Sequence, residues 1–230
     1  MNKWIRYSLP FLFMSLILAL VVGYVLLTYD KVQTHLWLNQ CHTVCGDFFF
    51  RYYTYVGEWV PYVIVAVLLF YKSGWASFLL TDVLLSGLIG QGIKHLADMD
   101  RPYRYFELHC PDIQLPFVDG VELSRFYSFP SGHTITFFAL MMTLTIIVID
   151  RLAMRDNQPR CKCYMWWISL VFFVLAVLGA YSRIYLSQHF LEDIFGGSII
   201  GVVTTAGLLY LVPKMESTRF WNWNLTYLHK

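Results

Sequence analysis

The sequence predicts an all-α, polytopic membrane protein, a helical bundle of six transmembrane helices with both termini in the cytoplasm. Of its 230 residues, 57% are hydrophobic and only 14% are charged, and the mean hydropathy is +0.52. An average soluble domain has about 25% charged residues. The apolar residues also come in blocks, and positive charges are concentrated on one side of these blocks. Together these observations exclude an ordinary soluble core.

The first block, Leu9–Tyr29, contains no charged residue, and as a helix it spans roughly 31 Å, about the thickness of a bilayer core. The apolar stretch is too long for a signal peptide and lacks an A-x-A-like site, so we expect an uncleaved first helix. The second block is long enough to cross the bilayer only if it begins near Tyr55, and the third block carries Asp82. The later blocks are Val60–Tyr71 with its flanks, Trp75–Ile93, Thr134–Ile149, Tyr164–Tyr181 and Phe190–Val212.

The distribution of basic residues sets the orientation of this bundle. With the amino terminus inside, ten of the 17 Lys and Arg residues fall in cytoplasmic segments. This excess follows the positive-inside rule and predicts that both termini are cytoplasmic. The long loops, Asp30 to Glu58 and Lys94 to Ser131, then lie outside, so we expect function at the outer face. No run of cations lies on a soluble domain, which argues against nucleic-acid binding.

We predict one domain, residues 1–230, without an internal repeat. The five cysteines give little information, because their number is odd and their spacing is not that of metal ligands. Cys41, Cys45 and Cys110 are expected outside, where unpaired thiols and one incidental disulfide both remain open.

Three polar clusters fall on the predicted outer side. The first ends the third helix, the second leads into the fourth helix, and the third joins the fifth helix to the sixth. In chain order they are Lys94 and Arg101; Ser131, Gly132 and His133; and Ser182, Arg183, His189 and Asp193.

The third cluster contains a nucleophile pair. His189 and Asp193 are four residues apart, so on a helix they share one face and can hydrogen-bond. A carboxylate held against one ring nitrogen fixes the tautomer and leaves the other nitrogen as a nucleophile. His133 of the second cluster could protonate a leaving oxygen.

The remaining cluster residues suit an anion. Ser131 and Gly132 stand at a helix start, where free N–H groups and the helix dipole favour negative charge. Lys94, Arg101 and Arg183 supply three positive charges for phosphate oxygens. Taken singly, Lys94 and Arg101 are typical of interfacial side chains that extend to water, and His133 and Asp193 of helix ends. Taken jointly, the clusters predict a phosphoryl-transfer site at the outer membrane edge.

The order K-x6-RP (Lys94 to Pro102), PSGH (Pro130 to His133) and SR-x5-H-x3-D (Ser182 to Asp193) resembles the signature of the type 2 phosphatidic acid phosphatase superfamily. That superfamily also includes soluble vanadium haloperoxidases, but a chain made mostly of bilayer spans argues against that branch. The resemblance covers residues 94–193, and six spans match the membrane branch. It implies that His189 forms a phosphohistidine, that Asp193 orients it, and that His133 is the acid.

The resemblance also implies which residues hold the phosphate and that no metal or other cofactor is needed. The phosphate-binding residues it implies are Lys94, Arg101, Ser131, Gly132 and Arg183. Its candidate substrates are undecaprenyl pyrophosphate, phosphatidylglycerophosphate, phosphatidic acid and the phosphates of lipid A. We expect the protein in a bacterial inner membrane with its site facing the periplasm.

Several alternatives remain open at this point. A lipid phosphotransferase would use the same phosphohistidine, and a non-enzymatic transporter or channel would use the charges to line its mouth. The residues do not select the lipid or the oligomeric state. They also leave open the roles of Asp82, which is too far along its helix from Lys94 to join the site, and of Glu58.

Overall fold

The structure is a computed structural model that describes residues 2–155 and 161–223. These residues form helices joined by loops, without a β-strand. The helices are α1 (Lys3–Thr28), α2 (Lys31–Asn39), α3 (Val44–Tyr53), the 3-10 helix η1 (Thr54–Gly57), α4 (Val60–Tyr71), α5 (Ser73–Ala97), α6 (Pro102–His109), α7 (Gly132–Arg155), α8 (Cys161–Tyr185), α9 (Leu191–Leu208), α10 (Val212–Glu216) and α11 (Arg219–Asn222).

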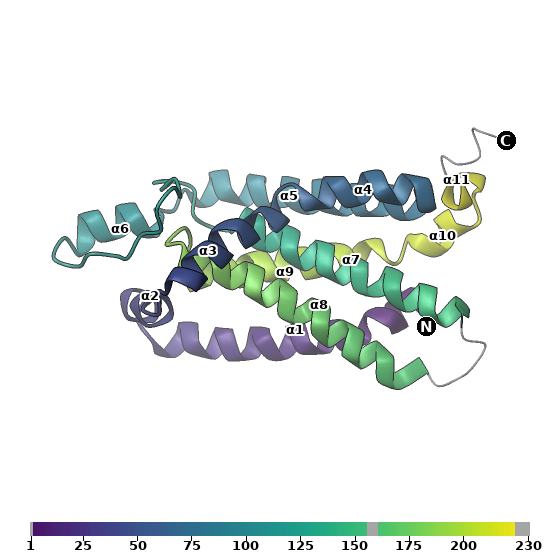
Figure 1. The fold of residues 1–230 in the computed structure, drawn as a ribbon, viewed down its shortest axis with the longest axis horizontal. Helices are drawn as coiled ribbons and strands as arrows, with labels where there is room; N and C mark the ends of the chain where they lie inside the picture. The colour runs from purple at the N-terminus through teal and green to yellow at the C-terminus, as the bar shows by residue number, and fades with distance from the viewer. Residues whose placement is uncertain (1, 156–160, 224–230) are drawn as a thin grey trace.

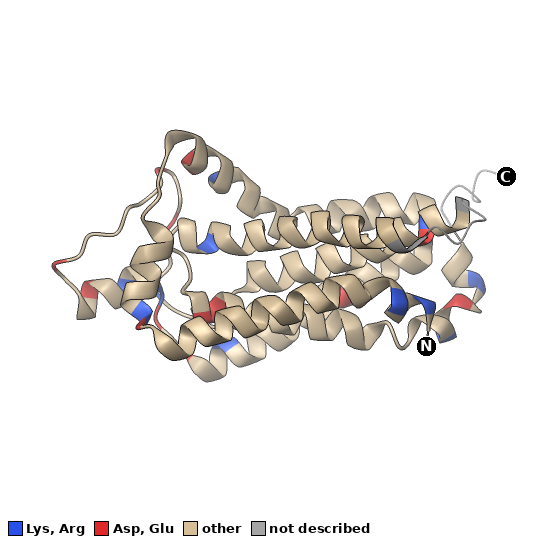
Figure 2. Ribbon diagram, turned by 90° about the horizontal axis from the view of Figure 1, so that it is seen from below, with Lys and Arg blue, Asp and Glu red and all other residues tan. Residues whose placement is uncertain are grey.

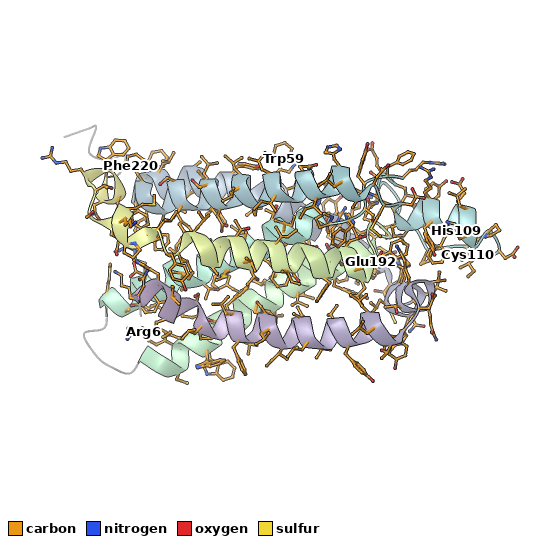
Figure 3. The ribbon with its side chains drawn as sticks, turned by 180° about the vertical axis from the view of Figure 1, so that it is seen from behind. Arg6, Trp59, His109, Cys110, Glu192 and Phe220 are labelled. Atoms are coloured by element: carbon orange, nitrogen blue, oxygen red, sulfur yellow. The ribbon has the colours of Figure 1, made fainter. Side chains whose placement is uncertain are left out.

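The long helices run side by side along the longest axis of the molecule (Figure 1). One end carries α2, α6 and the loops around them, and the other carries the start of α1 together with α10 and α11. Charged residues gather toward these two ends, and the stretch between them is largely free of charge (Figure 2). In Figure 3, Glu192 at the start of α9 lies toward the end that carries His109, and Arg6 lies at the opposite end. We call the end with α2 and α6 the outer end.

In the described part of the chain, five helices are long and apolar enough to cross a membrane. The number becomes six if α3–η1 and α4, which meet at a bend of 51°, form one broken span. The expected block Val60–Tyr71 coincides with α4, which has Pro61 in its first turn. The extension back toward Tyr55 that this short block requires passes through η1 and across the bend, so it is not one continuous helix. The last span ends at Leu208 instead of the expected Val212. Val212 begins the separate helix α10, which has Pro213 in its first turn.

Helix α7 is the centre of the bundle and packs against α1, α5, α8 and α9. Its side chains Phe137, Phe138 and Leu140 are fully buried. Helix α9 approaches it backbone to backbone. A Cβ atom built on Gly197 would lie 2.8 Å from the Ser131 carbonyl oxygen, and one on Gly201 would lie 2.6 Å from that of Ile135. Only glycine permits this spacing at the two positions.

Asp82 is fully buried at the middle of α5, where it joins three helices. Its Oδ2 accepts hydrogen bonds from Thr143 of α7 (3.1 Å) and Thr205 of α9 (2.8 Å). Its Oδ1 has no partner among the described residues. The structure thus places Asp82 in a contact that holds the bundle together, away from the signature residues.

Helix α2 covers the outer end of the bundle. The side chain of Asp30 caps it by accepting from the N–H groups of Val32 and Gln33. Its residue His35 is buried between the rings of Phe106 in α6 and Phe190 beside α9, at centroid distances of 5.6 and 5.1 Å. Neither ring nitrogen of His35 has a partner among the described residues. Burial therefore lowers the pKa of His35 to about 4, although the charge of Asp193 acts in the opposite direction.

This burial predicts a pH dependence of stability. Because the pKa of His35 is lower in the folded protein than its ordinary 6.5, its contribution is present above pH 6.5 and is lost as pH falls toward about 4. Replacing His35→Phe keeps the ring packing and removes the titrating group. Unfolding midpoints of the detergent-solubilised protein between pH 7 and pH 4 should fall less steeply for the variant. An identical slope for variant and wild type would contradict the assignment.

Candidate active site

The three polar clusters meet at the outer end of the bundle because five helix ends converge there. Lys94 lies in the last turn of α5, and Arg101 directly precedes α6. Ser131 precedes α7 and His133 lies in its first turn, whereas Arg183 lies in the last turn of α8. His189 occupies the turn between α8 and α9, and Asp193 lies in the first turn of α9.

His189 and Asp193 form the predicted pair. Nδ1 of His189 lies 3.3 Å from Oδ2 of Asp193, and both side chains are buried. The same Oδ2 accepts the N–H of Phe190 at 2.8 Å and the hydroxyl of Ser128. Asp193 thus caps its own helix and faces His189 at once. The arrangement leaves Nε2 of His189 as the ring nitrogen that Asp193 does not engage.

Burial lowers the pKa of His189 well below its ordinary value, and the charges of Arg101, Arg183 and Lys94 lower it further. A lowered pKa keeps the imidazole neutral at neutral pH, which a nitrogen nucleophile requires. The three cations therefore serve two purposes, since they also offer positive charge to an anion beside His189.

The start of α7 differs in one respect from the expected anion cradle. The N–H of Ser131 donates to the carbonyl oxygen of Asp193 at 3.0 Å, and its hydroxyl accepts from Thr134 at 3.0 Å. The first of these bonds ties the start of α7 to the start of α9, so the Ser131 N–H is not free for phosphate. The N–H groups of Gly132 and His133 have no such partner in the described part of the chain.

Neutral hydrogen-bond acceptors hold both arginines. Arg101 donates from Nη1 to Oε1 of Gln188 at 3.1 Å and from Nε to the Phe126 carbonyl at 3.0 Å. Arg183 is buried and donates from Nη1 to the hydroxyl of Thr54 in η1. Ser182 donates to the Gly179 carbonyl within α8, which is a structural contact.

A cavity of about 230 Å³ lies between α4, α5 and α7. Lys94 and His133 line it together with Glu58, Gln91 and Gly87. Glu58 is therefore next to the site, as a wall of the cavity. A larger hollow of about 660 Å³ lies between α2 and Pro116, but no signature residue lines it.

Among residues 2–155 and 161–223, no three His, Cys, Asp or Glu side chains are grouped so that they could hold one metal ion. Metal independence remains a prediction that an assay with a chelator tests. Cys41, Cys45 and Cys110 are free cysteines.

Three residues around the site were not identified from the sequence: Ser128, Gln188 and Thr54. All three are neutral and buried, and they contact signature residues through hydrogen bonds that join distant segments. Gln188 directly precedes His189, and Ser128 stands three residues before Ser131. Thr54 lies far from the signature, and no spacing indicates it.

The model of one protein family matches residues 75–216 of this chain, well over half its length, and its description is "PAP2 superfamily". The chain belongs to the PAP2 superfamily. This match includes all the predicted site residues and agrees with the resemblance seen in the sequence.

Curated PAP2 relatives include phosphatidylglycerophosphatase B of Bacillus subtilis, 26% identical over 159 residues, which are 67% of this chain and 64% of the relative. A lipid A 4'-phosphatase of Porphyromonas gingivalis is 31% identical over 175 residues, 70% of this chain and 64% of the relative. Lipid phosphate phosphatase 2 of Arabidopsis thaliana is 27% identical over 66% of this chain and 57% of its own length. The chain thus spans less than two thirds of these relatives.

Two solved structures share the PAP2 fold. The crystal structure of Aquifex aeolicus LpxE has a TM-score of 0.59 at 19% identity and covers 80% of this chain and 96% of its own. A transmembrane PAP2-type phosphatidylglycerolphosphate phosphatase from Bacillus subtilis has a TM-score of 0.58 at 21% identity and covers 93% and 98%. With its apolar helices, this likeness identifies the chain as an integral membrane protein.

Ser128→Ala tests the contact between Ser128 and Asp193. The variant removes one of the donors to Oδ2 and leaves the carboxylate less firmly placed against His189. Because a hydrogen bond to a charged group contributes about 1.5–3 kcal/mol, kcat for a lipid phosphate should fall ~10- to 100-fold. Steady-state kinetics measure this, with Ser198→Ala on α9 as control, because the Ser198 hydroxyl bonds only the Phe195 carbonyl. Unchanged kcat in Ser128→Ala would show that Ser128 does not position Asp193.

Proposed function

We propose that this protein is a lipid phosphatase that removes phosphate from a membrane lipid at the outer face of a bacterial inner membrane, through a phosphohistidine on His189. This proposal rests on the buried His189–Asp193 pair, on which the charges of Arg101, Arg183 and Lys94 act. The cavity between α4, α5 and α7, which Lys94 lines, offers space for a ligand. The names of the PAP2 relatives support the reaction class, since they are phosphatases of phosphatidylglycerophosphate, lipid A or lipid phosphates.

In the first half of the reaction, Nε2 of His189 attacks phosphorus and the bond from phosphorus to the lipid oxygen breaks. His133 gives its proton to that departing oxygen, and Asp193 holds the Nδ1 proton as positive charge develops on the ring. Arg101, Arg183 and Lys94 stabilise the charge on the three phosphoryl oxygens.

In the second half, a water molecule attacks the phosphohistidine. His133, now neutral, takes a proton from this water, and the bond between nitrogen and phosphorus breaks. Inorganic phosphate leaves, and both histidines return to their starting state. A lipid hydroxyl in place of the water would give a phosphotransferase.

The cavity supports a lipid as the substrate because it extends along the membrane helices. Lys94 and Gly87 both line it, and seven residues of helix correspond to about 10 Å of depth. Tyr62 of α4, which is exposed, also lines the cavity. A lipid could therefore place its phosphate beside Lys94 and His133 while its chain remains deeper along the helices.

The function is tested by phosphate release from the purified protein in detergent, with a chelator present. The panel contains undecaprenyl pyrophosphate, phosphatidylglycerophosphate, phosphatidic acid and lipid A, each with and without an acceptor lipid. We expect release from at least one lipid, and a loss on the order of a thousandfold or more in His189→Ala. Full activity in His189→Ala would exclude the phosphohistidine. Transfer to the acceptor without release would identify the transferase.

The cavity yields a separate prediction about lipid chains. A Cβ at Gly87 meets no atom within 4 Å, so Gly87→Leu should fold and fill part of the cavity. We expect KM for a long-chain lipid phosphate to rise about tenfold, in line with displaced apolar contact area, whereas KM for a short water-soluble phosphate ester should not change.

Gly92→Leu is the matched control, because Gly92 also lies in α5 with open space around its Cβ but does not line the cavity. Equal effects of the two variants, or an equal effect on both substrates, would refute a lipid chain in this cavity.

A further inference from the structure

The two arginines of the site lack the partners that buried arginines usually have. A buried cation is normally paired with a carboxylate, because unpaired charge is costly away from water. Arg183 is buried and Arg101 is partly buried, yet none of the ion pairs in residues 2–155 and 161–223 involves Arg101, Arg183 or Lys94.

Gln188 takes the place of a carboxylate beside Arg101. Its side chain is 4% exposed, and its Nε2 donates to the Glu122 carbonyl at 2.8 Å. Because the amide nitrogen is engaged there, Oε1 must face Arg101, whose Nη1 lies 3.1 Å away. The Phe126 carbonyl accepts from Nε of the same guanidinium. Two neutral acceptors thus fix its plane and leave Nη2 available.

Thr54 plays the same part for Arg183. It lies in η1, at the bend between α3 and α4, and its buried hydroxyl accepts from Nη1. Nε of Arg183 has no partner in the described part of the chain. The acid whose charge acts on Arg183 is Glu58, which is exposed on the cavity wall and makes no ion pair with it.

We propose that Gln188 and Thr54 are positioning residues that orient Arg101 and Arg183 toward phosphate without neutralising them. This inference rests on the proposed function, which makes phosphate the ligand. Neutral acceptors supply the geometry that a carboxylate would supply, and neither guanidinium has an ion-pair partner among the described residues until a phosphate binds. Part of the affinity for phosphate is therefore set by residues that never touch it.

The decisive variant is Gln188→Glu. It keeps an oxygen at the position that accepts from Arg101 but adds a negative charge, so Arg101 stays held and becomes neutralised. The probe is inorganic phosphate, whose Kd is obtained from the rise of the unfolding midpoint with phosphate concentration. We expect Kd to rise ~10- to 100-fold, as for loss of a charged hydrogen-bond partner. The midpoint without phosphate should fall only by the loss of the bond from Nε2 to the Glu122 carbonyl, and the phosphate-induced rise is measured from that lower midpoint.

Ser187→Ala is the control that shows whether loosening the outer loop alone changes Kd for phosphate. Ser187 precedes Gln188 and bonds the same outer loop through the Pro116 carbonyl, but it contacts neither arginine. Its Kd for phosphate should equal that of the wild type. Wild-type Kd in Gln188→Glu, or an equal rise in Ser187→Ala, would overturn the proposal for Gln188.

Thr54 is tested by a pair of variants. Thr54→Val keeps the shape and removes the acceptor, so Kd for phosphate should rise about tenfold, and Thr54→Ser should restore it because the hydroxyl returns. Failure of Ser to restore binding would overturn the proposal for Thr54.

These measurements need no lipid. A wild-type protein that binds phosphate but hydrolyses no lipid would refute the proposed function alone. A wild-type protein that does not bind phosphate would refute this inference as well.

Discussion

The close approach of α7 and α9 is the constraint on which the site depends. Gly197 and Gly201 let the two backbones meet, and the Ser131 N–H then reaches the Asp193 carbonyl at 3.0 Å. That bond holds the helix start with His133 against the helix start with Asp193. A side chain at either glycine would separate the two starts, and His133 and His189 would no longer lie close together.

The electrostatics of the site follow from an excess of positive over negative charge that the fold maintains. Arg101, Arg183 and Lys94 all act on His189, and the one buried carboxylate beside it, Asp193, is engaged with His189, Ser128 and the Phe190 N–H. Neutral groups perform the orienting that opposite charges perform elsewhere in proteins. The result is a region of positive potential at the outer end, enclosed by low-polarity helices that strengthen its field.

Sequence patterns predicted much of this arrangement because apolar blocks and signature spacing are local signals. The helical class, the family and the meeting of the three clusters all follow from them. The break in the second span does not follow from these signals, because Pro61 stands at a helix start that a hydropathy pattern does not detect. Nor do Ser128, Gln188 and Thr54, whose roles arise from contacts between segments far apart in the chain. Neutral polar residues carry no charge or period that would single them out.

The cavity between α4, α5 and α7 determines which measure of substrate concentration controls the rate, the one in the water or the one in the membrane. If the ligand arrives along the apolar walls near Gly87, it is found by diffusion in two dimensions, within the leaflet. The rate of encounter then depends on the mole fraction of the ligand among the surrounding lipids. It does not depend on the volume of water outside the membrane. Diluting the membrane with inert lipid would slow turnover even when the total amount of substrate is constant. The composition of the leaflet would thus govern the rate.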